Sequence, residues 1–118
     1  MFGFLRKILN RKNEDSPEYR LAFAQRISDK KIKYLSERVT DNKTGEVIDT
    51  ILGKGGYFHI NKENQLVIYC DGKEHFRAYI PNLQAWEFLS LEGVVLESFD
   101  FSQNKNRQII AYYKYYRD

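Results

Sequence analysis

The chain has 118 residues, of which 42% are hydrophobic and 15% aromatic, and its formal net charge is +3. This length predicts a single domain with one core, and the hydrophobic content excludes an intrinsically disordered chain. One cysteine excludes an internal disulfide, and the sequence shows no signal-peptide pattern, so we expect a cytoplasmic protein.

The first twelve residues are amphipathic if they form a helix. Their apolar arc holds Phe2, Phe4, Leu5, Ile8 and Leu9, and the opposite arc holds Arg6, Lys7 and Arg11. Such a segment is too short to span a bilayer, but it can bind an acidic membrane surface or a protein partner. We therefore expect it to attach the protein to the inner membrane face or to a partner, and an equally supported alternative is that it covers the domain's own core. Residues 1–15, this segment and a polar linker, are expected to precede one globular domain over 16–118.

A helix start follows the linker. Ser16 suits an N-cap, Pro17 suits the first turn, and Glu18 places a negative charge beside the positive end of the helix dipole. These residues predict a helix near 17–28, followed by a β body over 31–118.

From residue 31 onward the pattern is that of strands. Short runs rich in aromatic and β-branched residues alternate with stretches rich in turn formers, at 41–46, 53–56, 61–64, 71–73, 81–82 and 102–107. This spacing predicts a mainly β fold, a small antiparallel barrel or sandwich of about seven to eight strands. Residues 31–39 and 83–91 also fit a helix, although strand is preferred for the second. Apolar alternation predicts that Phe76 and Trp86 are buried.

Cys70 and His75 are the residue types of a thiol nucleophile and its base. In the predicted strands, however, Cys70 alternates with apolar residues and His75 lies on the solvent-facing side, so we expect a structural cysteine and no enzyme. The two histidines and one cysteine also lack the paired spacing of a zinc site, and no metal or cofactor is predicted. The glycines of 53–56 resemble a phosphate loop, but they precede a strand pattern instead of a helix, which favours a turn.

The last strand pattern, residues 108–116, is rich in tyrosine. One face, which carries Tyr113, suits the core, whereas Tyr112, Lys114 and Tyr116 lie on the other. We interpret this second face as a surface for a protein partner or for another copy of the chain, because tyrosine is enriched at interfaces.

Charge argues against nucleic acid as the partner. Residues 1–43 hold 11 Lys and Arg against 6 Asp and Glu, whereas residues 44–118 hold 8 against 10. A nucleic-acid-binding surface needs its own basic footprint, which the larger part of the chain lacks. The sequence therefore predicts a non-enzymatic binding or adaptor domain. A nucleic-acid-binding small β-barrel is the alternative, and an enzyme that uses Cys70 and His75 is a third.

A helical segment followed by a compact antiparallel barrel over residues 31–118 resembles the bacterial pleckstrin-homology-like domains in architecture. The resemblance implies a small bacterial-type β domain. No short motif carries it, and a strand pattern at the C-terminus replaces the closing helix of those domains. No functional residue is carried over from that family.

Overall fold

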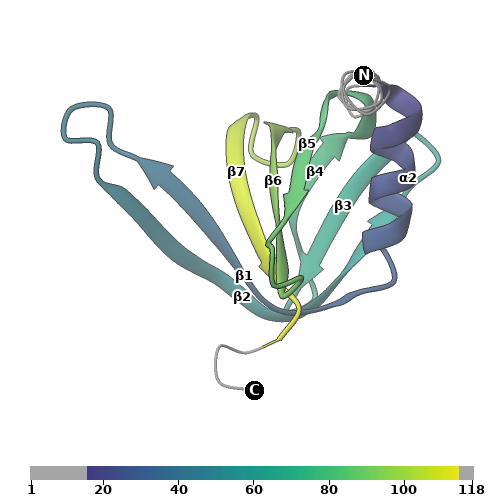
Figure 1. Cartoon of the computed structure of the whole chain (residues 1–118), viewed down its shortest axis with the longest axis horizontal. Helices are drawn as coiled ribbons and strands as arrows, with labels where there is room; N and C mark the ends of the chain where they lie inside the picture. The colour runs from purple at the N-terminus through teal and green to yellow at the C-terminus, as the bar shows by residue number, and fades with distance from the viewer. Residues whose placement is uncertain (1–15, 115–118) are drawn as a thin grey trace, which may run out of the picture.

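The computed structural model describes residues 16–114, and within them the chain forms one curved antiparallel sheet with a single α-helix (Figure 1). The elements in chain order are α2 (Pro17–Ile27), β1 (Lys31–Thr40), β2 (Val47–Ile60), β3 (Gln65–Cys70), β4 (Lys73–Tyr79), the 3-10 turn η1 (Ile80–Asn82), β5 (Gln84–Glu87), β6 (Gly93–Asp100) and β7 (Lys105–Tyr112). The strands pair in the order β4-β3-β2-β1-β7-β6-β5, so β4 and β5 are the two edges. The mainly β fold is as predicted. No helix in the described part of the chain is long and apolar enough to cross a membrane.

The helix α2 begins at the predicted residue. Ser16 is its N-cap, and the hydroxyl oxygen accepts a hydrogen bond from the backbone N–H of Tyr19 at 3.1 Å. Phe23, Ala24 and Ile27 lie on one side of the helix and are buried. This apolar side packs α2 against η1, β2 and β5.

The turn predicted at 53–56 is wrong, because β2 runs through it as one strand of 14 residues. The glycines instead allow β2 to lie very close to β3. A Cβ at Gly56 would collide with the carbonyl oxygen of Tyr69 and with the Cys70 Sγ. A register shift in the β1–β2 pairing falls just before this stretch and bends the two strands. Gly53 and Gly56 therefore allow the close approach to β3, and Gly55 adopts a positive φ of 70° within the strand.

The other strands are found with shifted ends. Strand is confirmed for residues 31–39, whereas within 83–91 the strand β5 covers only Gln84–Glu87. The last strand begins at Lys105, inside a stretch predicted as a turn, and ends at Tyr112.

The inner face of the curved sheet holds the core. Its largest buried side chains are Ile27, Ile32, Leu35, Leu66, Ile68, Phe76, Ile80, Leu83, Leu96 and Ile109. Phe76 is fully buried, as predicted. The prediction for Trp86 is wrong, because this side chain is 44% exposed. Ala85 packs against the core, and strand alternation therefore places Trp86 on the outer face.

The edge strand β4 folds against the end of β6 and partly closes the sheet. The backbone N–H of Phe101 donates to the carbonyl oxygen of Arg77 at 2.9 Å. The backbone N–H of Arg77 in turn donates to the carboxylate of Asp100, also at 2.9 Å. The sheet thus curls into an unclosed barrel whose seam is joined here by side-chain and turn contacts.

The β1–β2 hairpin projects away from the rest of the sheet (Figure 1). Every residue from 39 to 51 is exposed. The carboxylate of Asp41 shapes the tip, where it accepts a hydrogen bond from the backbone N–H of Lys43 at 2.7 Å. Residues 38–51 are termed the arm below.

Candidate functional site

Parts of the predicted surfaces lie outside the described residues. This applies to residues 2–11, the expected membrane or partner surface, and to Tyr116, so both stay predictions. Tyr113 packs against the core, as the alternation of the last strand predicts.

Tyr112 lies on the outer face among other rings. It stacks on Tyr34 with ring centroids 4.2 Å apart, and Phe88 tilts against it at 5.6 Å. The Nζ of Lys114 pairs with a carboxylate oxygen of Glu92 at 3.2 Å. Tyr112 is therefore partly buried by its own neighbours and offers less free ring surface than expected.

Cys70 and His75 show no activated thiol. Burial raises the pKa of the Cys70 thiol to about 11, and the neighbouring Asp71 carboxylate acts in the same direction. The ring Nε2 of His75 lies 3.2 Å from the backbone carbonyl oxygen of Cys70. The thiol is therefore protonated at neutral pH. Within residues 16–114 no group of three or more His, Cys, Asp or Glu could hold a metal ion.

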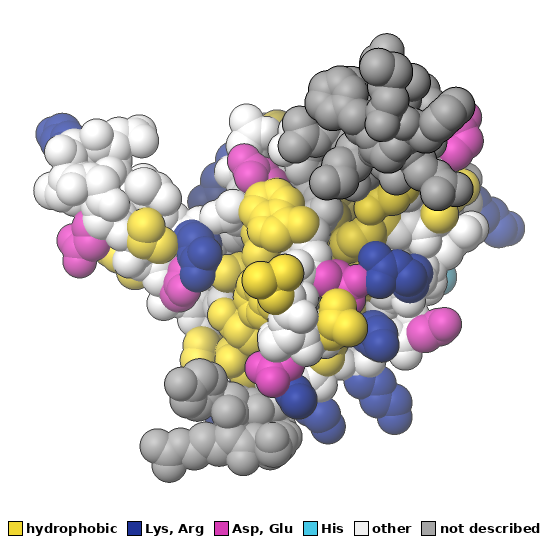
Figure 2. All heavy atoms as spheres, viewed as in Figure 1, with side chains coloured by type: hydrophobic (Ala, Val, Ile, Leu, Met, Phe, Trp, Pro, Cys, Tyr) yellow, Lys and Arg dark blue, Asp and Glu magenta, His cyan; other side chains and the backbone are white. Residues whose placement is uncertain are grey.

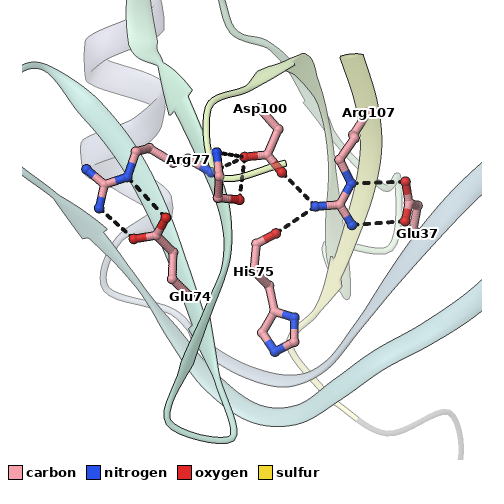
Figure 3. A network of polar contacts seen from close by, with 7 residues as sticks. Glu37, Glu74, His75, Arg77, Asp100 and Arg107 are labelled. Carbon is pink, nitrogen blue, oxygen red and sulfur yellow. Dashed lines mark hydrogen bonds and ion pairs between the residues drawn. The ribbon is translucent and has the colours of Figure 1, made fainter. Parts of the chain in front are cut away.

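A buried ionic network joins β1, β4, β6 and β7 (Figure 3). The Arg107 guanidinium donates to both carboxylate oxygens of Glu37, at 2.9 and 3.0 Å. It also donates to the Asp100 carboxylate at 2.6 Å and to the backbone carbonyl of His75 at 2.7 Å. The hydrogen bonds from Arg107 hold the pKa of Glu37 below its usual range. Because these charges satisfy one another and the His75 ring points away from them (Figure 3), we assign the network to closing the sheet.

The strand β5 is the open edge of the sheet. The backbone N–H of Phe88 donates to the carbonyl oxygen of Gly93 at 2.9 Å. In an antiparallel pair the bonded positions alternate, so Trp86 also bonds to β6. The N–H and C=O groups of Ala85 and Glu87 therefore point away from β6. In the described part of the chain no segment on that side bonds to them.

This edge borders a groove of about 510 Å³ between β5 and α2. The groove is lined by Tyr19, Arg20, Phe23 and Arg26 of α2 and by residues 83–87. Phe23 and Leu83 are buried, so they form an apolar floor. The volume falls within the range of about 300–1,000 Å³ that is typical of ligand sites.

Two arginines of α2 reach across the ends of the groove. Arg20 donates to the backbone carbonyl of Pro81, and Arg26 pairs with the carboxylate of Glu87. The Arg26 guanidinium also lies 4.8 Å from the centre of the Phe23 ring. Its side chain is 55% exposed, whereas that of Glu87 is 10% exposed. The groove thus combines an apolar floor with the exposed guanidinium of Arg26, which pairs with the Glu87 carboxylate.

Sequence reasoning did not find this groove. Pro81 and Asn82 mark the break before β5, but a break does not show that the following strand lies at a sheet edge. That property depends on the order in which distant strands pair. The prediction that Trp86 is buried was a further reason, because it left no exposed side chain at the rim of the groove.

Comparison of the chain with protein-family models, with curated proteins and with solved structures found no match. The function is therefore inferred from the geometry of the groove and of the sheet.

Proposed function

We propose that the protein is a non-enzymatic adaptor domain that binds an extended peptide as an additional strand on β5. The observation that supports this function is the outer edge of β5, with which no strand within residues 16–114 pairs and which faces an apolar groove with α2 on its far side. Strand addition uses such an edge, because backbone hydrogen bonds supply affinity and pockets for alternate side chains supply selectivity. An uncovered edge would otherwise be a site of non-specific pairing.

The groove also indicates the chemistry of the peptide. Since β5 has four residues, it can align a peptide of about four to six residues. Alternate side chains of the peptide would enter the groove over Phe23 and Leu83, which favours apolar residues there. The exposed guanidinium of Arg26, which already pairs with Glu87, can also donate to an acidic residue at the mouth. We therefore expect a ligand that combines apolar and acidic side chains.

Residues 1–15 lie outside the described residues and carry charges of both signs, so they are not assigned to the groove. Attachment of residues 1–12 to an acidic membrane is a separate proposal, which would place the adaptor at the membrane surface. The alternative, nucleic-acid binding, can be told apart from peptide binding because the affinity for nucleic acid would fall steeply as the salt concentration rises.

The test is a selection of phage-displayed random peptides against the full-length protein. Selected peptides are then titrated by fluorescence polarisation, with the emission of Trp86, the single tryptophan, as a second signal from the rim. The deciding variant is Ala85→Pro. Proline removes an N–H that points away from β6, so no bond to β6 is lost. The matched control, Ala85→Ser, keeps the N–H and nearly the same size.

We expect Ala85→Pro to abolish binding and Ala85→Ser to preserve it, while both variants keep the circular dichroism spectrum of the parent. Arg26→Glu should weaken acidic peptides selectively. Failure to select any peptide, or equal binding by Ala85→Pro, would overturn the proposed function.

A further inference from the structure

Side chains on the outer face of the sheet, away from the core, form level rows across five strands. The pairing register places Ile51, Ser36, Ile110, Val95 and Trp86 in one largely apolar row that runs from β2 to β5. The next row towards the arm tip is polar and holds Asp49, Arg38, Gln108, Glu97 and Gln84. Figure 2 shows hydrophobic side chains gathered in a band over β6 and β7, with charged side chains on both sides of it.

The apolar row is covered in its middle and open at its ends. Ser36, Ile110 and Val95 are buried. Ile51 on β2 is 61% exposed, and Trp86 on β5 is 44% exposed. These two large side chains lie on the same level of the sheet, two strands away from β7 on opposite sides.

The arm adds more uncovered apolar surface. Val39, Val47 and Ile48 are each about half exposed, and they lie on both faces of the hairpin. A two-stranded hairpin without cover is at best marginally stable in water. The arm continues two strands of the sheet, and a partner surface against these side chains would stabilise it further.

We propose that two copies of the chain pack outer face to outer face about a two-fold axis parallel to β7. Because β7 is the middle strand of the five, this axis places β1 of one copy over β6 of the other, and β2 over β5. Rotation about an axis parallel to the strands does not move residues along them, so each row faces the same row of the second copy. A two-fold contact requires such a self-complementary surface.

The apolar ends of the row match under this operation. Ile51 faces the second copy's Trp86, and the reverse contact is identical. One row further along, the arm residues Thr40 and Val47 come level with the second copy's Phe99. Phe99 is itself exposed. The same rotation thus covers exposed apolar side chains of the arm and of the sheet.

The charges match as well. Arg38 lies on β1 and Glu97 on β6, so each faces the other across the two-fold axis. Both are long side chains that can meet across the spacing of about 10 Å between packed sheets. Arg38 also holds Asp49, at 2.8 and 2.9 Å, which fixes the direction of its guanidinium. This complementarity favours a second copy over an unrelated partner.

The area of the outer face is comparable to that which a stable dimer interface buries. Five strands about 4.8 Å apart, with four rows about 6.8 Å apart, give a footprint of roughly 500–600 Å² per copy. A stable interface buries about 800 Å² per partner, and the arm can supply the difference.

The test is sedimentation equilibrium of the full-length protein at increasing concentration. We expect a dimer whose dissociation constant rises at least about tenfold in Glu97→Arg, because this change sets two positive charges against each other. The matched control is Glu63→Arg, an exposed charge reversal in the β2–β3 turn, which should leave the dimer unchanged. The double variant Arg38→Glu with Glu97→Arg exchanges the two charges and should restore association to within about threefold.

A monomer at every concentration overturns the proposal, as does a dimer that Glu97→Arg does not weaken or that the double variant does not restore. Circular dichroism checks the fold of each variant. If Glu97→Arg does not fold, Ile51→Asp at the exposed end of the row serves instead and must weaken the dimer. Peptide binding at β5 is measured separately, so loss of the dimer proposal leaves the proposed function standing.

Discussion

Removal of the Asp100 carboxylate should destabilise the seam between β4 and the β6–β7 turn. Asp100 is fully buried. One oxygen accepts hydrogen bonds from the backbone N–H of Arg77 and from the N–H and hydroxyl of Ser102, at 2.7 to 2.9 Å. The other accepts from Arg107 at 2.6 Å. The substitution Asp100→Ala leaves all these donors without their acceptor.

The expected loss of stability follows from the charge and the N–H donors that stay buried after the Asp100 carboxylate is removed. Loss of one partner from a buried ion pair costs about 3–5 kcal/mol, because the remaining charge keeps its desolvation penalty. Glu37 still neutralises Arg107, which lowers this cost, but an orphaned N–H at Arg77 adds about 1–3 kcal/mol. We therefore expect a loss of about 3–5 kcal/mol in the free energy of unfolding. Domains of this size have about 5–15 kcal/mol in total, and the melting temperature should fall by roughly 10–20 °C.

The assay is urea unfolding at one protein concentration, followed by the emission of Trp86 and by circular dichroism. The matched control is Glu74→Ala, which also removes a bidentate partner of an arginine, Arg77, but at a partly exposed position away from the outer rows. Exposed pairs contribute about 0–1 kcal/mol, so the control should lose little stability. Equal losses for the two variants would refute the argument that burial makes the Asp100 network important.

Four further outcomes are expected. Phe76→Ala should cost about 3–5 kcal/mol in the same titration, because the ring is fully buried, and a loss below about 1 kcal/mol would show that the core is assigned wrongly. The Cys70 thiol, with its pKa of about 11, should react with iodoacetamide only when the chain unfolds, and rapid alkylation of the folded protein at neutral pH would contradict its burial. The folded-state pKa of Glu37 is depressed, so its stabilising contribution is present above the unfolded pKa and is lost as the pH falls through the folded value. Glu37→Gln should therefore flatten the fall of stability below about pH 4, and curves parallel to the parent's would contradict this. The full-length protein should float with acidic vesicles at low salt and Ile8→Asp should not, and equal flotation of both would remove the membrane proposal.

Features that depend on neighbouring residues could be predicted without the structure. The cap at Ser16 with Pro17 and Glu18 in the first turn was enough to predict α2, because a helix start depends on interactions within one turn. Alternation along the last strand likewise placed Tyr113 on the core side, since side chains in a strand alternate whatever lies beside it. The mainly β class followed from the same local patterns.

Contacts between distant segments decided the features that carry the proposed functions. Gly56 provides a close contact with β3 and not a turn, because a partner strand passes beside it. Trp86 lies on the outer face of β5, and within residues 16–114 no strand besides β6 pairs with β5, so Ala85 and Glu87 have no backbone partner there. Arg38 and Glu97 lie on one level because three strands pair in one register. Strand order and register arise from long-range pairing, and for this reason local sequence patterns could not predict the groove or the outer rows.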